Sequence, residues 1–211
     1  MAFIDNLGFE LDSLILVTAI VFYTGVWIWW HHSRHESGPA VQHLRGGAVL
    51  LGILGGFLTL LGFWGEFTWP LPASYNLLFY DPTILVGILL LGFTATVWTN
   101  VPTQYVGVVG VVAGAGVIYY GARAYLLGLT TEPLEMFLMF LAFGALGVLS
   151  YPATLFLDLY VTPAAHGTTA APIGTIWKLA LAVFLAMAVL AGVAAILMGF
   201  NTVWSHLAKA P

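Results

Sequence analysis

The chain contains no cysteine among its 211 residues. This absence excludes disulfides, thiolate zinc sites, cysteine-ligated iron–sulfur clusters and c-type haem attachment. Any metal must therefore be held by histidine, carboxylate, methionine, tyrosine or backbone oxygen. The sequence thus limits the possible cofactors before any motif is considered.

Charge is also scarce, since only 7% of the residues are Asp, Glu, Lys or Arg. A soluble globular domain has about 25% charged residues, whereas 61% of this chain is hydrophobic and its mean hydropathy is +0.98. A water-soluble fold could not cover its core with so few charges, so the apolar surplus must face a lipid bilayer. No basic run is present, which argues against nucleic acid as a partner.

Long uncharged runs predict six membrane-spanning helices, because one span needs about 20 apolar residues. The runs are continuously apolar rather than alternating, which favours helices over the strands of a β-barrel. The polar stretch 99–104, which contains Pro102, divides the uncharged run 82–122 into two spans. We expect an all-α bundle, a single domain over residues 1–211, with helices at about 13–30, 46–65, 83–99, 105–122, 136–157 and 177–200.

Six spans place both termini on the same side of the cell membrane. The positive residues divide between the two predicted faces, with Arg34, Arg45 and Lys178 on one and Arg123 and Lys209 on the other. Because positive residues favour the cytoplasmic side, this small excess predicts that both termini lie outside.

Histidines gather where the first predicted helix ends. His31 and His35 are four residues apart and would share a helix face, and the loop 158–176 would bring Asp158 to the same side. Imidazole suits copper, zinc, iron or haem. The alternative is that these are polar residues at the membrane interface beside a tryptophan cluster. The candidate metal ligands are His31, His32, His35, His43 and His166, and the candidate cofactor-binding rings are Trp29 and Trp30.

The segment 63–82 is too apolar for an exposed loop and too rich in proline for a regular helix. Pro70, Pro72 and Pro82 interrupt it. We expect this segment to lie irregularly at the membrane interface or to re-enter the bundle. Irregular backbone at that depth is tolerated only inside protein or along a wet cavity.

Glu66 is an ionisable side chain among aromatics at the end of the second predicted helix, where it should pair or function. Arg123 and Asp81 are expected on the same side. An ion pair between Glu66 and Arg123 is one interpretation, and a proton or cation entry site is the other. The first predicted span begins at Ser13, after Glu10, so no predicted span has a carboxylate in its middle. This argues against a proton-driven pump.

Small residues at four-residue spacing occur in two predicted helices. Gly52 and Gly56 form one such pair, and Gly110 and Gly114 form another. Small residues allow helix backbones to approach closely in lipid. They indicate packing within the bundle or, alternatively, an interface between copies of the chain.

The stretch from Phe67 to Asp81, FTWPLPASYNLLFYD, resembles the signature of an uncharacterised family of small membrane proteins from archaea and some bacteria. The opening residues MAFIDNL are also similar to that family, which is known only as a domain of unknown function. The resemblance implies a short multi-helix membrane protein over most of the chain. It brings no activity, cofactor or site residue with it.

Three functions remain open. The first is a redox or electron-transfer role with haem b or copper at the histidine-rich face, and if the chain is an enzyme this predicts a membrane oxidoreductase. The second is an accessory or structural subunit of a membrane complex, or a homo-oligomer, which needs only packing faces. The third is a channel or transporter for a small solute or ion, lined in part by the irregular segment 63–82.

Overall fold

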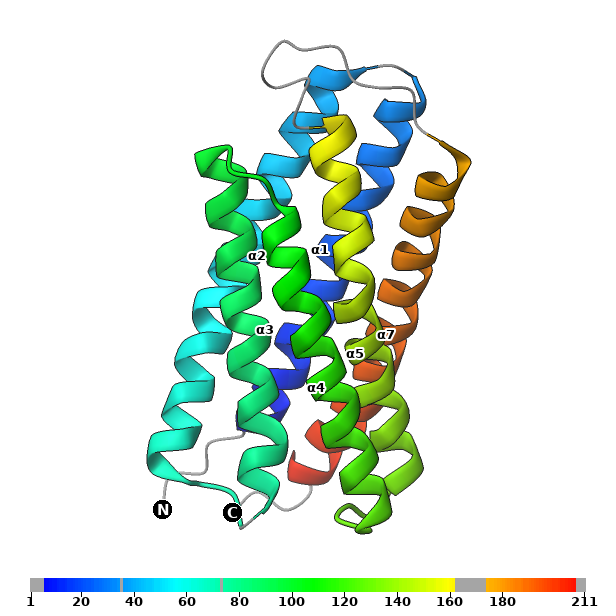
Figure 1. Ribbon diagram of the computed structural model, residues 1–211. Helices are drawn as coiled ribbons and strands as arrows, with labels where there is room; N and C mark the ends of the chain where they lie inside the picture. The colour runs from blue at the N-terminus through cyan, green and yellow to red at the C-terminus, as the bar shows by residue number, and fades with distance from the viewer. Residues whose placement is uncertain (1–5, 35, 73, 162–173, 208–211) are drawn as a thin grey trace.

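The computed structural model describes residues 6–34, 36–72, 74–161 and 174–207, which form a bundle of long helices (Figure 1). The helices are α1 (Asn6–Ser33), α2 (Ser37–Thr68), α3 (Ser74–Thr99), α4 (Gln104–Leu126), α5 (Pro133–Phe156) and α7 (Thr175–Leu207), and the π-helix η1 (Leu157–Val161) continues α5. The all-α prediction is confirmed, and no strand occurs in the described part of the chain.

The six long helices form a closed ring. Each helix packs against the one before it, and α7 completes the ring by packing against both α5 and α1. The helices alternate in direction, so α1 begins and α7 ends at the lower end of the bundle in Figure 1. The connections α1–α2 and α3–α4 lie at the upper end, and the connections α2–α3 and α4–α5 lie at the lower end.

The outer surface of the ring is apolar. All six long helices are long and apolar enough to cross a membrane. Large hydrophobic side chains point outward, among them Leu60 and Val112, which are 73% and 71% exposed. In water such a surface would be strongly unfavourable, whereas in lipid it is the expected exterior. The chain is therefore a multi-pass membrane protein.

The irregular segment is much shorter than the predicted 63–82. Helix α2 continues to Thr68 and α3 begins at Ser74, so only 69–73 connects them. Pro82 lies inside α3 and is buried. Proline is tolerated within a membrane helix because neighbouring helices and side chains can satisfy the freed backbone groups. The proline content of this segment therefore does not break the helix there.

The short α2–α3 connection is held by one asparagine. Helix α2 ends where Trp69 adopts a left-handed backbone conformation (φ 47°) and donates its N–H to the Gly65 carbonyl at 2.9 Å. The fully buried Asn76 accepts a hydrogen bond from the Leu71 N–H at 3.3 Å. Its amide nitrogen donates to the Gly65 carbonyl at 3.2 Å. Asn76 thus satisfies backbone groups on both sides of the turn, which buried backbone requires.

Helices α4 and α5 touch through their backbones. Gly114 of α4 faces Gly144 and Gly147 of α5, and a Cβ at Gly114 would lie 2.7 Å from the Val148 backbone nitrogen. Gly110, one turn earlier, faces the Ser150 hydroxyl. Predicted packing within the bundle is confirmed for this helix face. An interface between copies of the chain stays a prediction.

This contact generates a stability prediction. Gly114→Ala places a methyl group against backbone atoms that cannot rotate away, so α4 and α5 must separate. We expect a loss of about 1–3 kcal/mol, as for other overpacked sites. The measurement is thermal unfolding of the purified protein in mild detergent.

Gly116→Ala is the matched control. Gly116 lies in the same helix as Gly114, but a Cβ at this position would meet no neighbouring atom within 4 Å. Alanine is a better helix former than glycine, so this variant should be as stable as the parent or slightly more stable. Equal stability of the two variants would contradict the close contact.

Candidate functional site

Three rings at the upper end of the bundle pack against one another. The centroids of Trp27 and His43 are 5.1 Å apart with planes 5° from parallel, and those of His31 and His43 are 5.2 Å apart at 19°. The Trp27 and His31 rings are also stacked, at 5.6 Å. The Nδ1 atom of His31 lies 2.6 Å from a carboxylate oxygen of Glu36, which fixes the orientation of that ring. The structure thus brings together two of the predicted histidines, from α1 and α2.

His32 points in a different direction from its neighbour. Its ring lies 5.8 Å from the Phe156 ring and 5.9 Å from the Tyr160 ring, on α5 and η1. Trp29 packs against the buried cluster at the same end, whereas Trp30 is exposed and lies under the guanidinium of Arg34 at 4.2 Å. Among the described ring contacts, neither tryptophan packs on the rings of His31 and His43.

A metal held by His31 and His43 would need nitrogens of both rings directed at one point, because the lone pair of an imidazole nitrogen lies in the plane of the ring. In the described part of the chain, no group of three His, Asp or Glu side chains could hold a metal ion. His35 and His166 lie outside the described residues.

Asp158 caps α4 instead of joining the histidines. Its Oδ1 accepts hydrogen bonds from the backbone N–H and the hydroxyl of Thr103, both at 2.8 Å, and its Oδ2 accepts one from the Gln104 N–H at 2.8 Å. A carboxylate is favoured at a helix N-terminus because backbone N–H groups there lack partners. Asp158 thereby ties η1 to the start of α4.

Glu66 and Asp81 meet at the lower end of the bundle. The Asn76 amide donates to Glu66 Oε1 at 3.3 Å, and the Tyr120 hydroxyl donates to Asp81 Oδ2 at 2.5 Å. The two carboxyl groups also lie within reach of each other. Arg123 is exposed, and the described residues contain no salt bridge between it and Glu66. The structure therefore brings together Glu66 and Asp81 but leaves Arg123 apart, and a proton or cation site here stays a prediction.

Glu10 is a buried carboxylate, although the first span predicted from the sequence begins after it, at Ser13. Helix α1 begins at Asn6, so Glu10 lies within it, and only 5% of the residue is exposed. The Thr83 hydroxyl of α3 donates to Oε1 of Glu10. Helical spacing could have found it, because Glu10 stands four residues before Leu14 and seven before Val17, which face the bundle interior.

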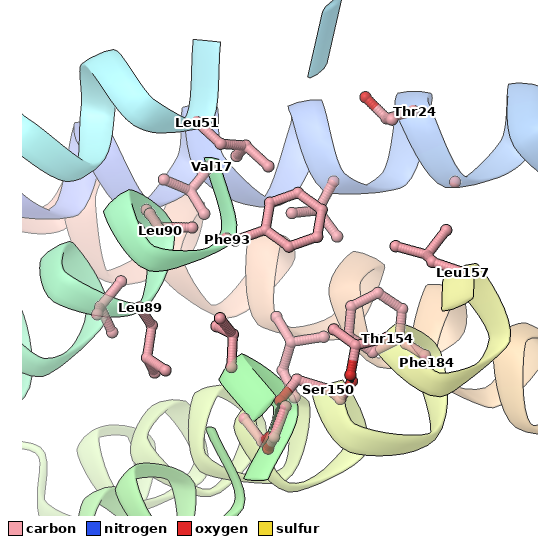
Figure 2. Close-up of a pocket in the computed structure, with 18 of the residues that line it drawn as sticks. Val17, Thr24, Leu51, Leu89, Leu90, Phe93, Ser150, Thr154, Leu157 and Phe184 are labelled. Atoms are coloured by element: carbon pink, nitrogen blue, oxygen red, sulfur yellow. Dashed lines mark hydrogen bonds between the residues drawn. The ribbon is translucent and has the colours of Figure 1, made fainter. Parts of the chain in front are cut away.

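The centre of the ring is hollow. A cavity of about 200 Å³ lies between the six long helices, each of which contributes side chains to its wall. Figure 2 shows Val17 and Thr24 on α1, Leu89, Leu90 and Phe93 on α3, and Ser150 and Thr154 on α5 around this space. Nearly all of the lining side chains are hydrocarbon.

Two of the three hydroxyl groups in the wall donate to helix carbonyls. Ser150 donates to the Gly147 carbonyl at 2.6 Å, and Thr154 donates to the Ser150 carbonyl at 2.9 Å. The Thr24 hydroxyl lies against Gly47 of α2. Hydroxyls that bond to helix backbone offer little to a ligand. Chemically, the wall of the cavity is therefore mostly a hydrocarbon surface.

The cap on α4 generates a second prediction. Asp158→Ala leaves the N–H groups of Thr103 and Gln104 without their acceptor, and we expect a loss of about 1–2 kcal/mol in unfolding free energy. Asp158→Asn keeps one acceptor oxygen and should lose less. Glu132→Ala is the control, because Glu132 precedes α5 but makes no capping hydrogen bond. Thermal unfolding in detergent measures all three, and equal stability of the alanine variants would count against the cap.

Comparison with known proteins gives a family and no activity. No curated protein and no solved structure matches the chain. One family, described as a protein of unknown function (DUF981), matches residues 1–209. The match agrees with the uncharacterised family that the sequence resembles. Because it spans nearly the whole chain, the protein belongs to the DUF981 family.

Proposed function

We propose that this membrane protein binds an apolar molecule, a hydrocarbon chain of a lipid or isoprenoid, in the cavity at the centre of its six-helix ring. The observation that carries the proposal is the cavity itself, whose wall is built by all six long helices and is almost wholly apolar. Ligand sites between the helices of a bundle are commonly apolar and preformed.

The size of the cavity supports an occupant. Side chains around an empty hollow of about 200 Å³ lack contact partners on one side, and the lost contacts disfavour the folded state. An apolar ligand would offset this cost by restoring the missing contacts, and the surrounding bilayer supplies hydrocarbon chains at high concentration.

The same wall argues against an ion or a polar solute as the occupant. An ion that leaves water needs oxygen or nitrogen partners to replace its hydration shell. The hydroxyls of Ser150 and Thr154 donate to helix carbonyls and do not form such a ring of partners. The cavity therefore favours ligand binding over the channel hypothesis.

The redox hypothesis depends on the histidines and not on this cavity. Neither His31 nor His43 lines the cavity wall, and their rings stack on each other and on Trp27. No contact among the described residues favours haem b or copper there. A role as an accessory subunit is compatible with a bound lipid but is not favoured by any particular contact.

The proposal predicts that filling the cavity abolishes binding without harming the fold. Val17 lines the cavity and is 5% exposed. Val17→Phe adds an aromatic ring to the hollow, so we expect an equal or higher unfolding temperature together with a loss of saturable binding. The probe is a long-chain alkyl diazirine, photolysed with the protein in mild detergent, and mass spectrometry locates the labelled residues.

Leu16→Phe is the matched control, since Leu16 is the adjacent residue on α1 and is 53% exposed toward lipid. It should leave cavity labelling unchanged. In the parent protein the label should reach Leu90 and Phe93 and be competed by unlabelled alkane. Labelling that is confined to outward residues, or that never saturates, would refute the proposal.

A further inference from the structure

One end of the hollow interior carries a buried carboxylate. A second cavity, of about 60 Å³, lies below the central one and is lined by Glu10 and Thr83 together with apolar side chains. The two cavities share Leu14, Val86 and Phe143 in their walls. They are therefore neighbouring compartments of one interior, and Glu10 stands in the wall of the smaller one.

The Glu10 carboxylate is only half satisfied. Oε1 accepts a hydrogen bond from the Thr83 hydroxyl, but Oε2 is buried with no hydrogen-bond partner in the described part of the chain. Among the residues that line the smaller cavity, only Glu10 and Thr83 have polar side chains, and none is cationic. A buried carboxylate without a partner is strongly unfavourable in a membrane protein, so such residues pair or function.

The carboxylate can turn either oxygen toward the cavity. Rotation about the last side-chain bond of glutamate is soft, because its preferred torsions are broad. The hydrogen bond from Thr83 holds the group at this position on α1 against α3. Oε2 is not exposed to the cavity as it stands, so a ligand meets it only after the carboxylate turns about this bond.

We propose that Glu10 binds the protonated amine of an amphipathic ligand whose apolar body occupies the central cavity. This inference rests on the proposed function and narrows its ligand class to lipophilic amines. The unpartnered oxygen of Glu10 would accept a hydrogen bond from the amine, and no cation in the cavity wall competes for it. The adjoining hydrocarbon cavity would hold the apolar body of the ligand. An ammonium group supplies both the missing donor and the missing positive charge.

An amine fits better than the other two partners that Glu10 could take. An alcohol supplies a donor but leaves the negative charge uncompensated in an apolar surrounding. A proton alone neutralises the carboxyl but leaves the cavity beside it unfilled. The three partners differ in how binding depends on the end group of the ligand, and this difference can be measured.

The experiment compares three alkyl diazirines of equal length that end in an amine, a hydroxyl or a methyl group. Saturable labelling of the cavity is measured at neutral pH with the full-length protein in mild detergent. We expect the amine to bind about tenfold or more tightly than the methyl-ended chain, the ratio typical of one charge-assisted hydrogen bond. In Glu10→Gln this preference should disappear while the methyl-ended chain binds as before.

Asp12→Asn is the matched control, because Asp12 is an exposed carboxylate on the same helix. It should retain the preference for the amine. Equal binding of all three chains, a preference for the alcohol, or an amine preference that survives in Glu10→Gln would each overturn the role of Glu10. In those cases the apolar cavity site still stands. A failure of all three chains to label the cavity saturably would instead overturn the proposed function.

A measurement on the parent protein alone covers the case in which Glu10→Gln does not fold. A ligand that binds only the folded state raises the unfolding temperature, and at equal concentration the rise is larger for the ligand with the lower Kd. At matched concentrations the amine-ended chain should raise it most. An equal rise with the methyl-ended chain would overturn the inference without any variant.

Discussion

Helices in lipid gain little from hydrophobic association, because lipid chains are as apolar as the side chains that they would replace. Association must come from close packing, and here it comes from glycines that let neighbouring backbones touch. Gly114 against Gly144 and Gly147 joins α4 to α5, and Gly55 against Gly87 joins α2 to α3. The helix pairs α4–α5 and α2–α3 make the most extensive contacts in the bundle. The other helices complete the ring around these two pairs.

A ring whose strongest contacts lie between neighbours does not need a filled centre. Buried clusters lie at both ends, with Phe156 and Tyr160 at the upper end and Phe79 and Phe140 at the lower end. A third cluster, which includes Leu14 and Leu51, lies between them and forms part of the wall of the central cavity. The apolar cavity thus lies inside a ring of helices, two pairs of which are joined closely by glycines.

The two ends of the bundle differ in chemistry. The upper end holds stacked His31 and His43 beside tryptophan, together with arginine guanidinium groups over Trp30 and Trp98. These arrangements are typical of a membrane interface. The lower end holds carboxyl groups, and Glu10 among them stands in the wall of the smaller cavity. The proposed contact between Glu10 and an amine therefore lies at the acidic end of the bundle.

Composition and long apolar runs determined the membrane setting, the all-α class and the number of spans, because lipid imposes the length and the apolar character of each helix separately. Helix ends were harder to predict, since Pro82 is accommodated within α3. Three features were decided only by tertiary structure. They are the pairing of Glu66 with Asn76 and Asp81, the capping of α4 by Asp158, and the smaller cavity whose wall contains Glu10. Each joins side chains from different helices, and no run within one helix can specify which neighbours it will meet.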